Sequence, residues 1–313
     1  MRPFLLLLPL SVLALIAAVL ARAMIWVGIM DQPAGRKAHA RPTPKAGGIA
    51  VIGACLAGGL LLAPLWDMRA GIAGGAALSL GVVGLLDDVR DRGVGVKLAA
   101  QIAAAMLVAS LGNGDPIGWA LSVLWLVGIT NMFNFMDGLD GLAGGTGLIA
   151  ALFLAAAAPH GGPTQAGALA LAAGLAGFLP FNLAPARLFL GDTGSQFCGF
   201  LLGVLGLGLW QETAMAHSFW LLPALLAGMI FDVGLTLCRR LLAGARLTQA
   251  HREHFYQRAP LPAWAVAAVH WGFATLGGAA GLLMEAGLVL PVLLLPQLAW
   301  LGFVHRHGVR IPA

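Results

Sequence analysis

The sequence predicts an all-α, polytopic membrane helix bundle of about 10 or 11 transmembrane helices, and three observations support this prediction. Of the 313 residues, 59% are hydrophobic and only 10% are charged, and the mean hydropathy is +0.88. A soluble domain carries about 25% charged residues, so this surface is too apolar for water. Apolar runs near the roughly 20 residues that span a bilayer follow one another along the chain. We therefore expect residues 1–313 to form one integral membrane domain.

The candidate spans follow in order, and several are short, so one or two are expected to be tilted or merged. The first run could be a signal peptide, because Arg2 precedes it and Ala21-Arg22-Ala23 resembles a cleavage site. The run continues through Ile29 with no polar domain behind it, so we expect it to be retained as a helix. The approximate bounds of the candidates are 4–28, 47–65, 70–86, 97–112, 117–134, 141–158, 165–182, 196–210, 217–238, 262–283 and 287–304.

The charged residues between these spans predict an orientation. Nearly all Lys and Arg fall in the odd-numbered gaps and in the C-terminal tail. The even-numbered gaps hold one basic residue, Arg69, and the acidic residues Asp67, Asp115, Glu212 and Glu285. An excess of Lys and Arg marks the cytoplasmic side, so we expect a periplasmic N-terminus. The formal net charge of +5 then reflects topology and anionic ligands, and it does not indicate nucleic acid as a partner.

Acidic residues are concentrated in the same odd gaps. A charged side chain at the bilayer centre costs about 2.5–3.5 kcal/mol, so Asp87, Asp88, Asp137, Asp140 and Asp192 together would cost roughly 15 kcal/mol. We therefore expect these carboxylates at helix ends or around one wet cavity on the cytoplasmic side.

Two of the polar segments have an alternative explanation. Lys45 lies in a Pro- and Gly-rich loop, 31–48, whose basic residues suit phosphates but also suit a topology signal that contacts lipid headgroups. The third span ends in the adjacent carboxylates of Asp87 and Asp88, which repel each other. A proton or a divalent cation would relieve this repulsion. Mg²⁺ is usually held by one or two carboxylates together with substrate phosphates. A solvated helix terminus explains the Asp pair equally well.

The stretch from Thr130 to Gly141 is the most informative. Asn131, Asn134 and Asp137 follow at three-residue spacing, which places neighbours on successive turns of a helix, and Asp140 comes next. Glycines directly after the two aspartates permit a break in the helix. Carboxylate and amide oxygens suit Mg²⁺, and the amides also suit a nucleotide base or a sugar. A purely structural role would require neighbouring helices to satisfy four polar groups.

Asp192 stands just before a new helix in the segment 191–195, which follows Asn182. It could be an N-cap, favoured by the helix dipole, or a metal ligand beside backbone N–H groups that face phosphate. The two roles are compatible.

The last large loop of the odd set contains His251, Arg252 and His254. The two histidines would share a helix face, but they lack an acidic third ligand and the His-Glu-x-x-His order of a zinc site. Imidazolium and guanidinium groups suit a pyrophosphate or a sugar better. An amphipathic surface helix in contact with lipid is the alternative.

Taken together and in this order, the motifs resemble the polyprenyl-phosphate N-acetylhexosamine-1-phosphate transferase superfamily (glycosyltransferase family 4), in particular its O-antigen-initiating branch. The likeness extends from Asp31 to Arg258. Its marks are Arg36-Lys37-x-His39, Lys45-Ala46-Gly47-Gly48, Asp87-Asp88, Asn131-x-x-Asn134-x-x-Asp137-Gly138-x-Asp140-Gly141, Asn182, Gly191-Asp192-x-Gly194-Ser195 and the loop with His251 and His254.

The resemblance implies a role for each matching residue. Asp87 resembles the proposed base or nucleophile, and Asp88 and Asp192 complete the catalytic set. Asp192 resembles the principal Mg²⁺ ligand, with Asn134 and Asp88 beside it. Contacts with nucleotide, phosphate or sugar, or supporting structural roles, are implied for Lys45, Lys97, Asn131, Asp137, Asp140, Asn182, His251, Arg252 and His254.

The implied reaction transfers a sugar-1-phosphate from a UDP-sugar to undecaprenyl phosphate and releases UMP, with Mg²⁺ as cofactor and Mn²⁺ as a substitute. The loop His251-Arg252-Glu253-His254 looks more like the branch that transfers 6-deoxy-N-acetylhexosamines. UDP-GlcNAc and UDP-MurNAc-pentapeptide are the alternatives. The resemblance implies a multi-pass protein of the bacterial inner membrane, with its active site facing the cytoplasm. Its role would be the first membrane step of O-antigen or other cell-envelope glycan synthesis. A homodimer is compatible with the sequence.

Two mechanisms and two other protein classes remain to be compared. The lipid phosphate could attack the UDP-sugar directly, or Asp87 could form a covalent intermediate, and the sequence does not separate these routes. A transporter should show an inverted repeat and polar groups at the bilayer midplane. A transferase of CDP-alcohols should carry a tight aspartate cluster on two helices. Neither pattern is present.

Overall fold

The computed structural model describes most of the chain, and within the described part most residues are helical. The described residues are 4–31, 42–62, 65–90, 92–112, 115–213, 216–246, 251–284 and 286–309. The helices are α1 (Phe4–Val27), α2 (Gly48–Leu61), α3 (Met68–Val89), α4 (Val94–Ala109), α5 (Pro116–Met136), α6 (Leu142–Ala157), α7 (Pro163–Asn182), α8 (Gly191–Thr213), α9 (Ala216–Leu225), α10 (Ala227–Leu242), α11 (Phe255–Arg258), α12 (Ala263–Leu283) and α13 (Ala286–His307).

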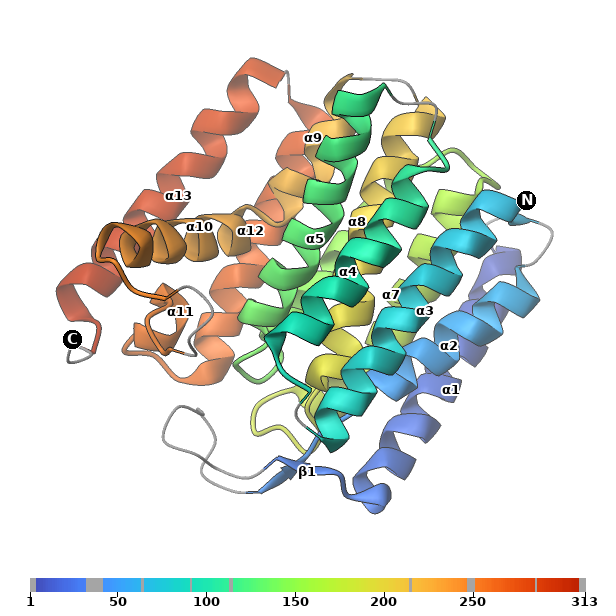
Figure 1. The fold of residues 1–313 in the computed structure, drawn as a ribbon, viewed down its shortest axis with the longest axis horizontal. Helices are drawn as coiled ribbons and strands as arrows, with labels where there is room; N and C mark the ends of the chain where they lie inside the picture. Colours follow the sequence, from blue (N-terminus) through green and yellow to red (C-terminus); the bar gives the residue numbers. More distant parts are fainter. Residues whose placement is uncertain are drawn as a thin grey trace.

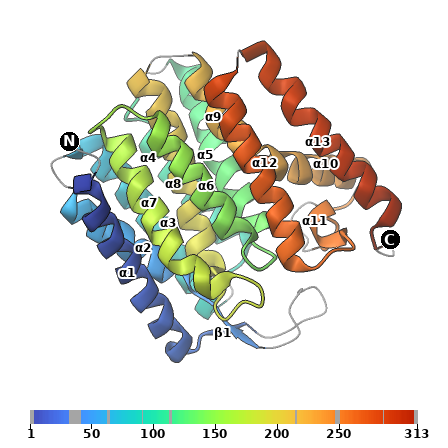
Figure 2. The ribbon, with the colours of Figure 1, turned by 180° about the vertical axis from the view of Figure 1, so that it is seen from behind.

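The helices confirm the predicted polytopic membrane bundle. Among the described residues, seven helices are long and apolar enough to cross a membrane, or eight if the bent pair α9–α10 is one span. Three shorter apolar helices, α2, α4 and α6, stand between them in the chain. Each predicted span corresponds to one of these elements. Figures 1 and 2 show them side by side, with α10 lying across the bundle.

The observed helix bounds differ by a few residues from the approximate spans, and two of these differences matter for the polar residues. The third span, given approximately as 70–86 and expected to end in the Asp pair, is α3, which continues through Val89 and holds Asp87 and Asp88 in its last turn. The eighth was expected to start at residue 196, but α8 starts at Gly191, so Asp192 lies in its first turn rather than before it. The sequence locates helix ends only to within a few residues. The carboxylates are accommodated inside the helices because groups on neighbouring helices bind them.

α8 is the central helix of the bundle. Its residues from Thr193 to Gly203 are buried, and it packs against α3, α5 and α2. Two glycines let the neighbouring helices approach its N-terminus. A Cβ atom at Gly84 of α3 would overlap the backbone of Asp192, and one at Gly48 of α2 would overlap that of Gly194. The close contact brings the end of α3 and the start of α2 to the first turn of α8.

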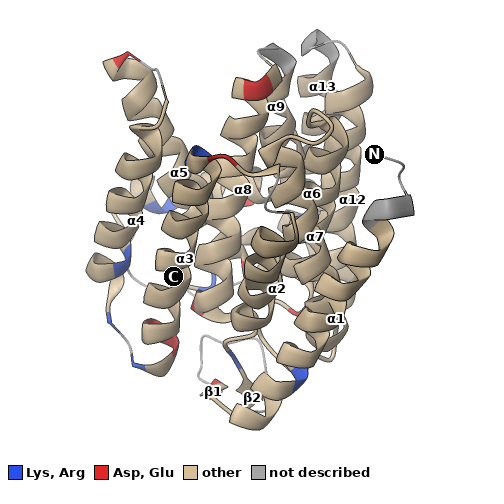
Figure 3. Ribbon diagram, turned by 90° about the vertical axis from the view of Figure 1, so that its right-hand side faces the viewer, with Lys and Arg blue, Asp and Glu red and all other residues tan. Residues whose placement is uncertain are grey.

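A short antiparallel ribbon lies at the same end of the bundle. β1 (Met30–Asp31) pairs with β2 (Thr43–Pro44), with Asp31 opposite Thr43. The ribbon brings Asp31 and Lys45 together, while the motif residues Arg36, Lys37, His39 and Arg41 lie outside the described residues. Figure 3 shows that most Lys and Arg lie in the half of the bundle that holds β1 and β2.

The ninth predicted span is broken rather than continuous. α9 and α10 meet at Leu226 with a bend of 69°. Pro223 lies in the last turn of α9, and a proline removes a helical hydrogen bond and promotes such a kink. The bend turns α10 across the bundle, and α10 contacts the segment 251–258 through Asp232, Arg239 and Arg240.

Candidate active site

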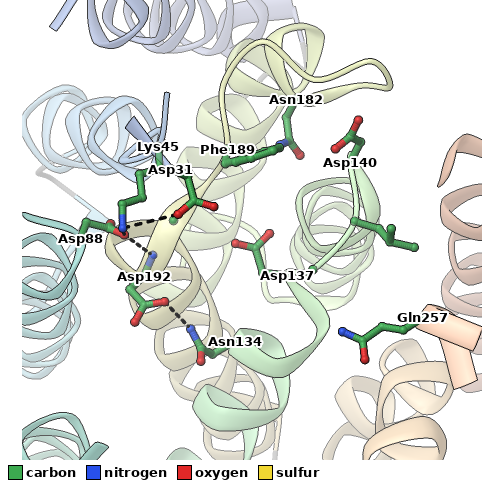
Figure 4. Close-up of a pocket in the computed structure, with 13 residues that line it drawn as sticks. Asp31, Lys45, Asp88, Asn134, Asp137, Asp140, Asn182, Phe189, Asp192 and Gln257 are labelled. Carbon is green, nitrogen blue, oxygen red and sulfur yellow. Dashed lines mark hydrogen bonds and ion pairs between the residues drawn. The ribbon is translucent and has the colours of Figure 1, made fainter. Parts of the chain in front are cut away.

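A polar cavity of about 280 Å³ lies at the end of the bundle where these elements meet (Figure 4). Five aspartates line it, whereas among the described residues Lys45 is the only lysine or arginine that does so. The full lining is Asp31, Lys45, Asp88, Asn134, Asp137, Gly138, Leu139, Asp140, Asn182, Phe189, Gly191, Asp192 and Gln257. Segments far apart in the chain therefore contribute to one negatively charged cavity.

The Asp88 carboxylate binds the first turn of α8. Its Oδ1 accepts the backbone N–H of Asp192 at 3.2 Å, and its Oδ2 accepts the backbone N–H and the hydroxyl of Thr193 at 2.9 and 2.7 Å. The first N–H groups of a helix lack internal partners and form its positive end, so a carboxylate is favoured there. The carboxylate that satisfies these groups is therefore that of Asp88, and the capping role considered for Asp192 was wrong. Asp88 Oδ1 also lies 3.5 Å from Lys45 Nζ.

Lys97 joins two carboxylates beside the cavity. Its Nζ lies 2.9 Å from Asp87 Oδ2 and 2.6 Å from Asp192 Oδ2. The other oxygen of Asp87 accepts the backbone N–H of Arg92 at 2.8 Å. Both Asp87 oxygens are thus engaged, and Asp87 is not among the residues that line the cavity. Lys97 partly neutralises the site from its edge.

Asn134 holds the second oxygen of Asp192. Its Nδ2 donates to Asp192 Oδ1 at 3.1 Å and to the Ser195 hydroxyl at 2.7 Å. α5 and α8 are therefore tied together at the cavity, as Figure 4 shows for the first of these bonds. The predicted neighbourhood of Asn134 and Asp192 is present in the structure.

Asn131 lies apart from the cavity lining. It exchanges hydrogen bonds with Gln101 of α4, at 2.6 and 3.3 Å, and Gln101 also donates to Gln196 of α8 at 2.7 Å. These amides link three helices, so the geometry supports the structural reading of Asn131. Its nucleotide-binding role stays a prediction.

Asp140 and Asn182 line the cavity and also hold its wall. Asp140 Oδ2 accepts the backbone N–H of Ala186 at 2.9 Å. Asn182 accepts the N–H of Gly141 at 3.1 Å and donates to the carbonyl of Leu188 at 3.0 Å. The two side chains join the turn after α5 to the loop after α7, and a binding role for either remains a prediction.

Asp137 lies in the turn after α5 and faces this concentration of carboxylates. Burial raises the pKa of its carboxyl well above the usual range, and the nearby Asp192, Asp88 and Asp140 raise the pKa further. Asp137 therefore keeps its proton more readily than a free aspartate, because burial and the neighbouring carboxylates disfavour its charged form.

The segment 251–258 approaches the cavity through one residue. Only Gln257 of this segment lines the cavity, whereas His251, Arg252 and His254 do not. Burial and the nearby His254 and Arg240 lower the pKa of His251 to about 4. His251 is therefore neutral near pH 7, and the imidazolium expected from the sequence is not formed at this position. Glu253 pairs with Arg239 and Arg240 of α10.

Three lining residues lie outside the quoted motifs and had no assigned role in the sequence interpretation, namely Asp31, Phe189 and Gln257. Asp31 had a weak signal, since it begins the basic loop that contains Lys45, and its carboxylate lies 3.8 Å from Lys45 Nζ. Phe189 and Gln257 had none, because an aromatic residue or an amide in a loop is common.

The donor set fits Mg²⁺ that is bound together with phosphates. Among the described residues, no three His, Cys, Asp or Glu side chains are grouped to hold a metal ion by themselves. Mg²⁺ commonly uses only one or two carboxylates, with substrate phosphates and water completing its shell. Asp192, with Asn134 and Asp88 close to it, offers such an oxygen-rich set.

Comparison with known proteins gives the family. The model of glycosyl transferase family 4 matches residues 71–209, the part of the chain that contains the Asp pair, the Asn134 stretch and Asp192. A Bacillus subtilis (strain 168) protein named probable undecaprenyl-phosphate N-acetylglucosaminyl 1-phosphate transferase is 33% identical over 263 residues, which cover 78% of this chain and 73% of the relative. The chain belongs to glycosyl transferase family 4.

Two further relatives show the breadth of this family. A decaprenyl-phosphate N-acetylglucosaminephosphotransferase of Mycolicibacterium smegmatis is 30% identical, over 74% of this chain and 68% of the relative. A phospho-N-acetylmuramoyl-pentapeptide-transferase of Deinococcus radiodurans is 36% identical, over 47% of this chain and 52% of the relative. The family and the enzyme class predicted from the sequence are confirmed.

Proposed function

We propose that this membrane enzyme transfers an N-acetylhexosamine-1-phosphate from a UDP-sugar to a polyprenyl phosphate. The observation that supports it most directly is the single cavity in which Asp88, Asn134 and Asp192 meet Lys45, with Lys97 at its edge. Both reactants are phosphate anions, so they need an arrangement that offsets their repulsion. Phosphoryl transfer depends chiefly on such positioning and charge stabilisation.

The reaction is proposed as a direct transfer. An oxygen of the lipid phosphate forms a bond to the β-phosphorus of the UDP-sugar, the bond from that phosphorus to the bridging oxygen breaks, and UMP leaves. A phosphate monoester has a second pKa of about 6, so it is largely dianionic at neutral pH and needs no strong base. The paired oxygens of Asp87 support this route over covalent catalysis by Asp87.

The chain's own residues would orient and neutralise the phosphates. Lys45 Nζ faces the cavity and can contact a phosphate oxygen, while Lys97 bridges the carboxylates of Asp192 and Asp87. Mg²⁺ held by Asp192, with Asn134 and Asp88 nearby, would supply charge neutralisation of the pyrophosphate, and Mn²⁺ is expected to substitute. Binding of Mn²⁺ in the presence of UDP, followed by electron paramagnetic resonance, should be lost in Asp192→Ala.

The donor sugar is proposed to be N-acetylglucosamine. The names of two relatives specify N-acetylglucosamine, which favours this alternative over the 6-deoxy sugar predicted from the 251–254 loop. Undecaprenyl phosphate is the proposed acceptor. The product would begin a cell-envelope glycan, with O-antigen among the candidates.

The proposed location is the bacterial inner membrane, with the cavity facing the cytoplasm. Arg92 is exposed near the cavity, and Gln211 is exposed at the other end of α8. In a Cys238→Ser background, an impermeant thiol reagent applied to intact spheroplasts should label Gln211→Cys but not Arg92→Cys. The reverse pattern would contradict the proposed orientation.

The activity test uses the purified full chain in nanodiscs with undecaprenyl phosphate and labelled UDP-N-acetylhexosamines. We expect a lipid-linked product and UMP in equal amounts, with UDP-GlcNAc as the best donor, and no turnover after chelation of divalent cations. Absence of product with every UDP-N-acetylhexosamine would overturn the proposed function. A phospho-aspartate trapped at Asp87 would instead favour the covalent route.

A further inference from the structure

Asp232 of α10 is a buried carboxylate outside the cavity. Only 2% of its side chain is exposed. Its Oδ1 accepts Nδ1–H of His254 at 3.0 Å and the backbone N–H of Phe255 at 3.1 Å, and its Oδ2 accepts the backbone N–H of Tyr256 at 2.8 Å. One carboxylate therefore holds three consecutive residues of the segment 251–258.

A carboxylate in this position is costly unless its oxygens are satisfied by donors. Here the partners are a histidine ring, the start of one turn and, at 3.5 Å, the hydroxyl of Thr236, rather than a lysine or an arginine. Because a carboxylate only accepts hydrogen bonds, His254 Nδ1 carries a proton and donates it to Asp232, and Nε2 is left for another group. Asp232 thereby fixes the orientation of the His254 ring.

The same turn is fastened to the cavity side by Tyr256. Its hydroxyl donates to the carbonyl of Phe135 in the last turn of α5 at 2.9 Å and accepts from Gln257 Nε2 at 3.1 Å. Burial raises the pKa of Tyr256, so the phenol keeps its proton. The hydroxyl fits because Gly138 has no side chain, and a Cβ atom there would overlap it.

These contacts place Gln257 in the wall of the cavity. Figure 4 shows Gln257 on the opposite side of the cavity from Lys45. A cationic side suits phosphates, and a neutral amide suits the hydroxyl and acetamido groups of a sugar. The turn held by Asp232 therefore borders the end of the cavity that fits the sugar.

We infer that Asp232 is a positioning residue for the donor sugar, acting through His254 and the turn that ends at Gln257. The inference rests on the proposed transferase function. Asp232 itself touches no reactant, because it lies outside the cavity and is enclosed by the turn.

The test compares Asp232→Asn with wild type in the full chain. The amide is nearly isosteric with the carboxylate, but its NH₂ group donates hydrogen bonds and cannot accept them. It would therefore face a backbone N–H or the proton on His254, and the turn would lose the hydrogen bonds that hold it. We expect kcat/KM for the UDP-sugar to fall about 10–100-fold, the range found when an orienting carboxylate is lost. KM for undecaprenyl phosphate should stay unchanged, and Tm should fall only modestly, because the buried N–H groups of one short turn lose an acceptor. Asp232→Glu, which keeps the charge, should recover part of the loss.

A second variant keeps the inference testable if Asp232→Asn folds poorly, and hydrogen exchange tests the release of the turn where Asp232→Asn does fold. Tyr256→Phe removes only the hydroxyl contacts and should raise KM for the UDP-sugar without changing KM for the lipid. Hydrogen exchange of the Phe255 and Tyr256 amides should accelerate in Asp232→Asn. The control is Asp115→Asn, which alters a carboxylate that accepts the N–H of Gly118 at the far end of the bundle and should leave both readouts unchanged.

The outcomes separate this inference from the proposed function. If wild type is inactive on every donor, the proposed function fails. If wild type is active and Asp232→Asn and Tyr256→Phe match it in KM and kcat, the positioning role fails while the transferase function stands. A loss of Tm together with equal changes in both KM values would show a general structural role and would also overturn the inference.

Discussion

The two ends of the bundle use acidic residues in different ways. At the end away from the cavity, Asp67 and Asp115 each accept an N–H of their own helix, from Ala70 at 2.7 Å and from Gly118 at 2.8 Å. At the cavity end, Asp88 lies on α3 but accepts hydrogen bonds from N–H groups of α8. Asp192 is bound by Lys97 of α4 and Asn134 of α5. Asp67 and Asp115 each stabilise a single helix, whereas the cavity acids depend on several helices.

This difference separates stability from chemistry. A local cap satisfies its carboxylate within one turn and leaves no charge for a ligand. The cavity end collects more carboxylates than lysines, which is unfavourable for folding and useful only if a cation and charged reactants bind there. The two ends should therefore respond to the same substitution in opposite ways.

The largest difference is expected for Asp192→Asn compared with Glu212→Gln. Asp192→Asn should lower kcat/KM on the order of 10²–10³-fold, the effect of removing one preorganised charge-stabilising group, with little change in Tm. Glu212 accepts the N–H and hydroxyl of Thr164 at 3.1 and 2.6 Å, so its variant should lower Tm and keep kcat/KM. Steady-state kinetics and thermal unfolding check both. Equal activity in the two variants would contradict the assignment of Asp192.

The next effect concerns Lys97. Lys97→Met leaves Asp87 and Asp192 facing each other without an ammonium, and we expect kcat/KM to fall on the order of 10²-fold because one partner of a charged network is lost. Arg69→Met, on an exposed residue at the far end, should leave the kinetics unchanged. If the change in the free energy of unfolding of the double variant Asp87→Asn/Lys97→Met equals the sum of the changes in the two single variants, the two residues are not coupled.

A moderate effect is expected when the two kinds of cap are compared. Asp88→Ala leaves the N–H groups of Asp192 and Thr193 without their acceptor, which should cost about 1–3 kcal/mol of unfolding free energy and also abolish most activity. Asp115→Ala should cost about 0.5–2 kcal/mol and keep the activity. Denaturation in detergent together with the transfer assay measures both. Full activity in Asp88→Ala would argue against its place in the site.

The smallest effect is a pH dependence from His251. Its pKa in the folded protein is about 4, below the ordinary 6.5, so the unfolded chain binds the proton more readily between these values. Stability from this residue is therefore complete above pH 6.5 and is lost as the pH falls towards 4. His251→Gln should reduce the fall in Tm over this window and match wild type at pH 8. Identical pH profiles would show that His251 is not buried as described.

Much of the cavity could be predicted because its residues are rare in an apolar chain. Asp88, Asn134 and Asp192 interrupt long hydrophobic segments, and the cost of burying such groups reveals their importance without knowledge of their partners. Gln257 and Phe189 could not be predicted, since their side chains are not costly in a loop. The pairing of Asn131 with Gln101 was also missed, because the sequence does not state which helices are neighbours.

By itself, the sequence determined that the protein is a membrane helix bundle and which residues are too polar to lie against lipid. Hydrophobic length and the cost of buried charge are local properties, and they are visible in any linear sequence. Only the tertiary structure decided that Asp88 caps α8, that Lys97 joins Asp87 to Asp192, and that α10 bends to place Asp232 beneath His254. These contacts depend on how the helices pack, and two of them, Asp88 with Thr193 and Lys97 with Asp192, join residues 105 and 95 positions apart, which no local pattern encodes.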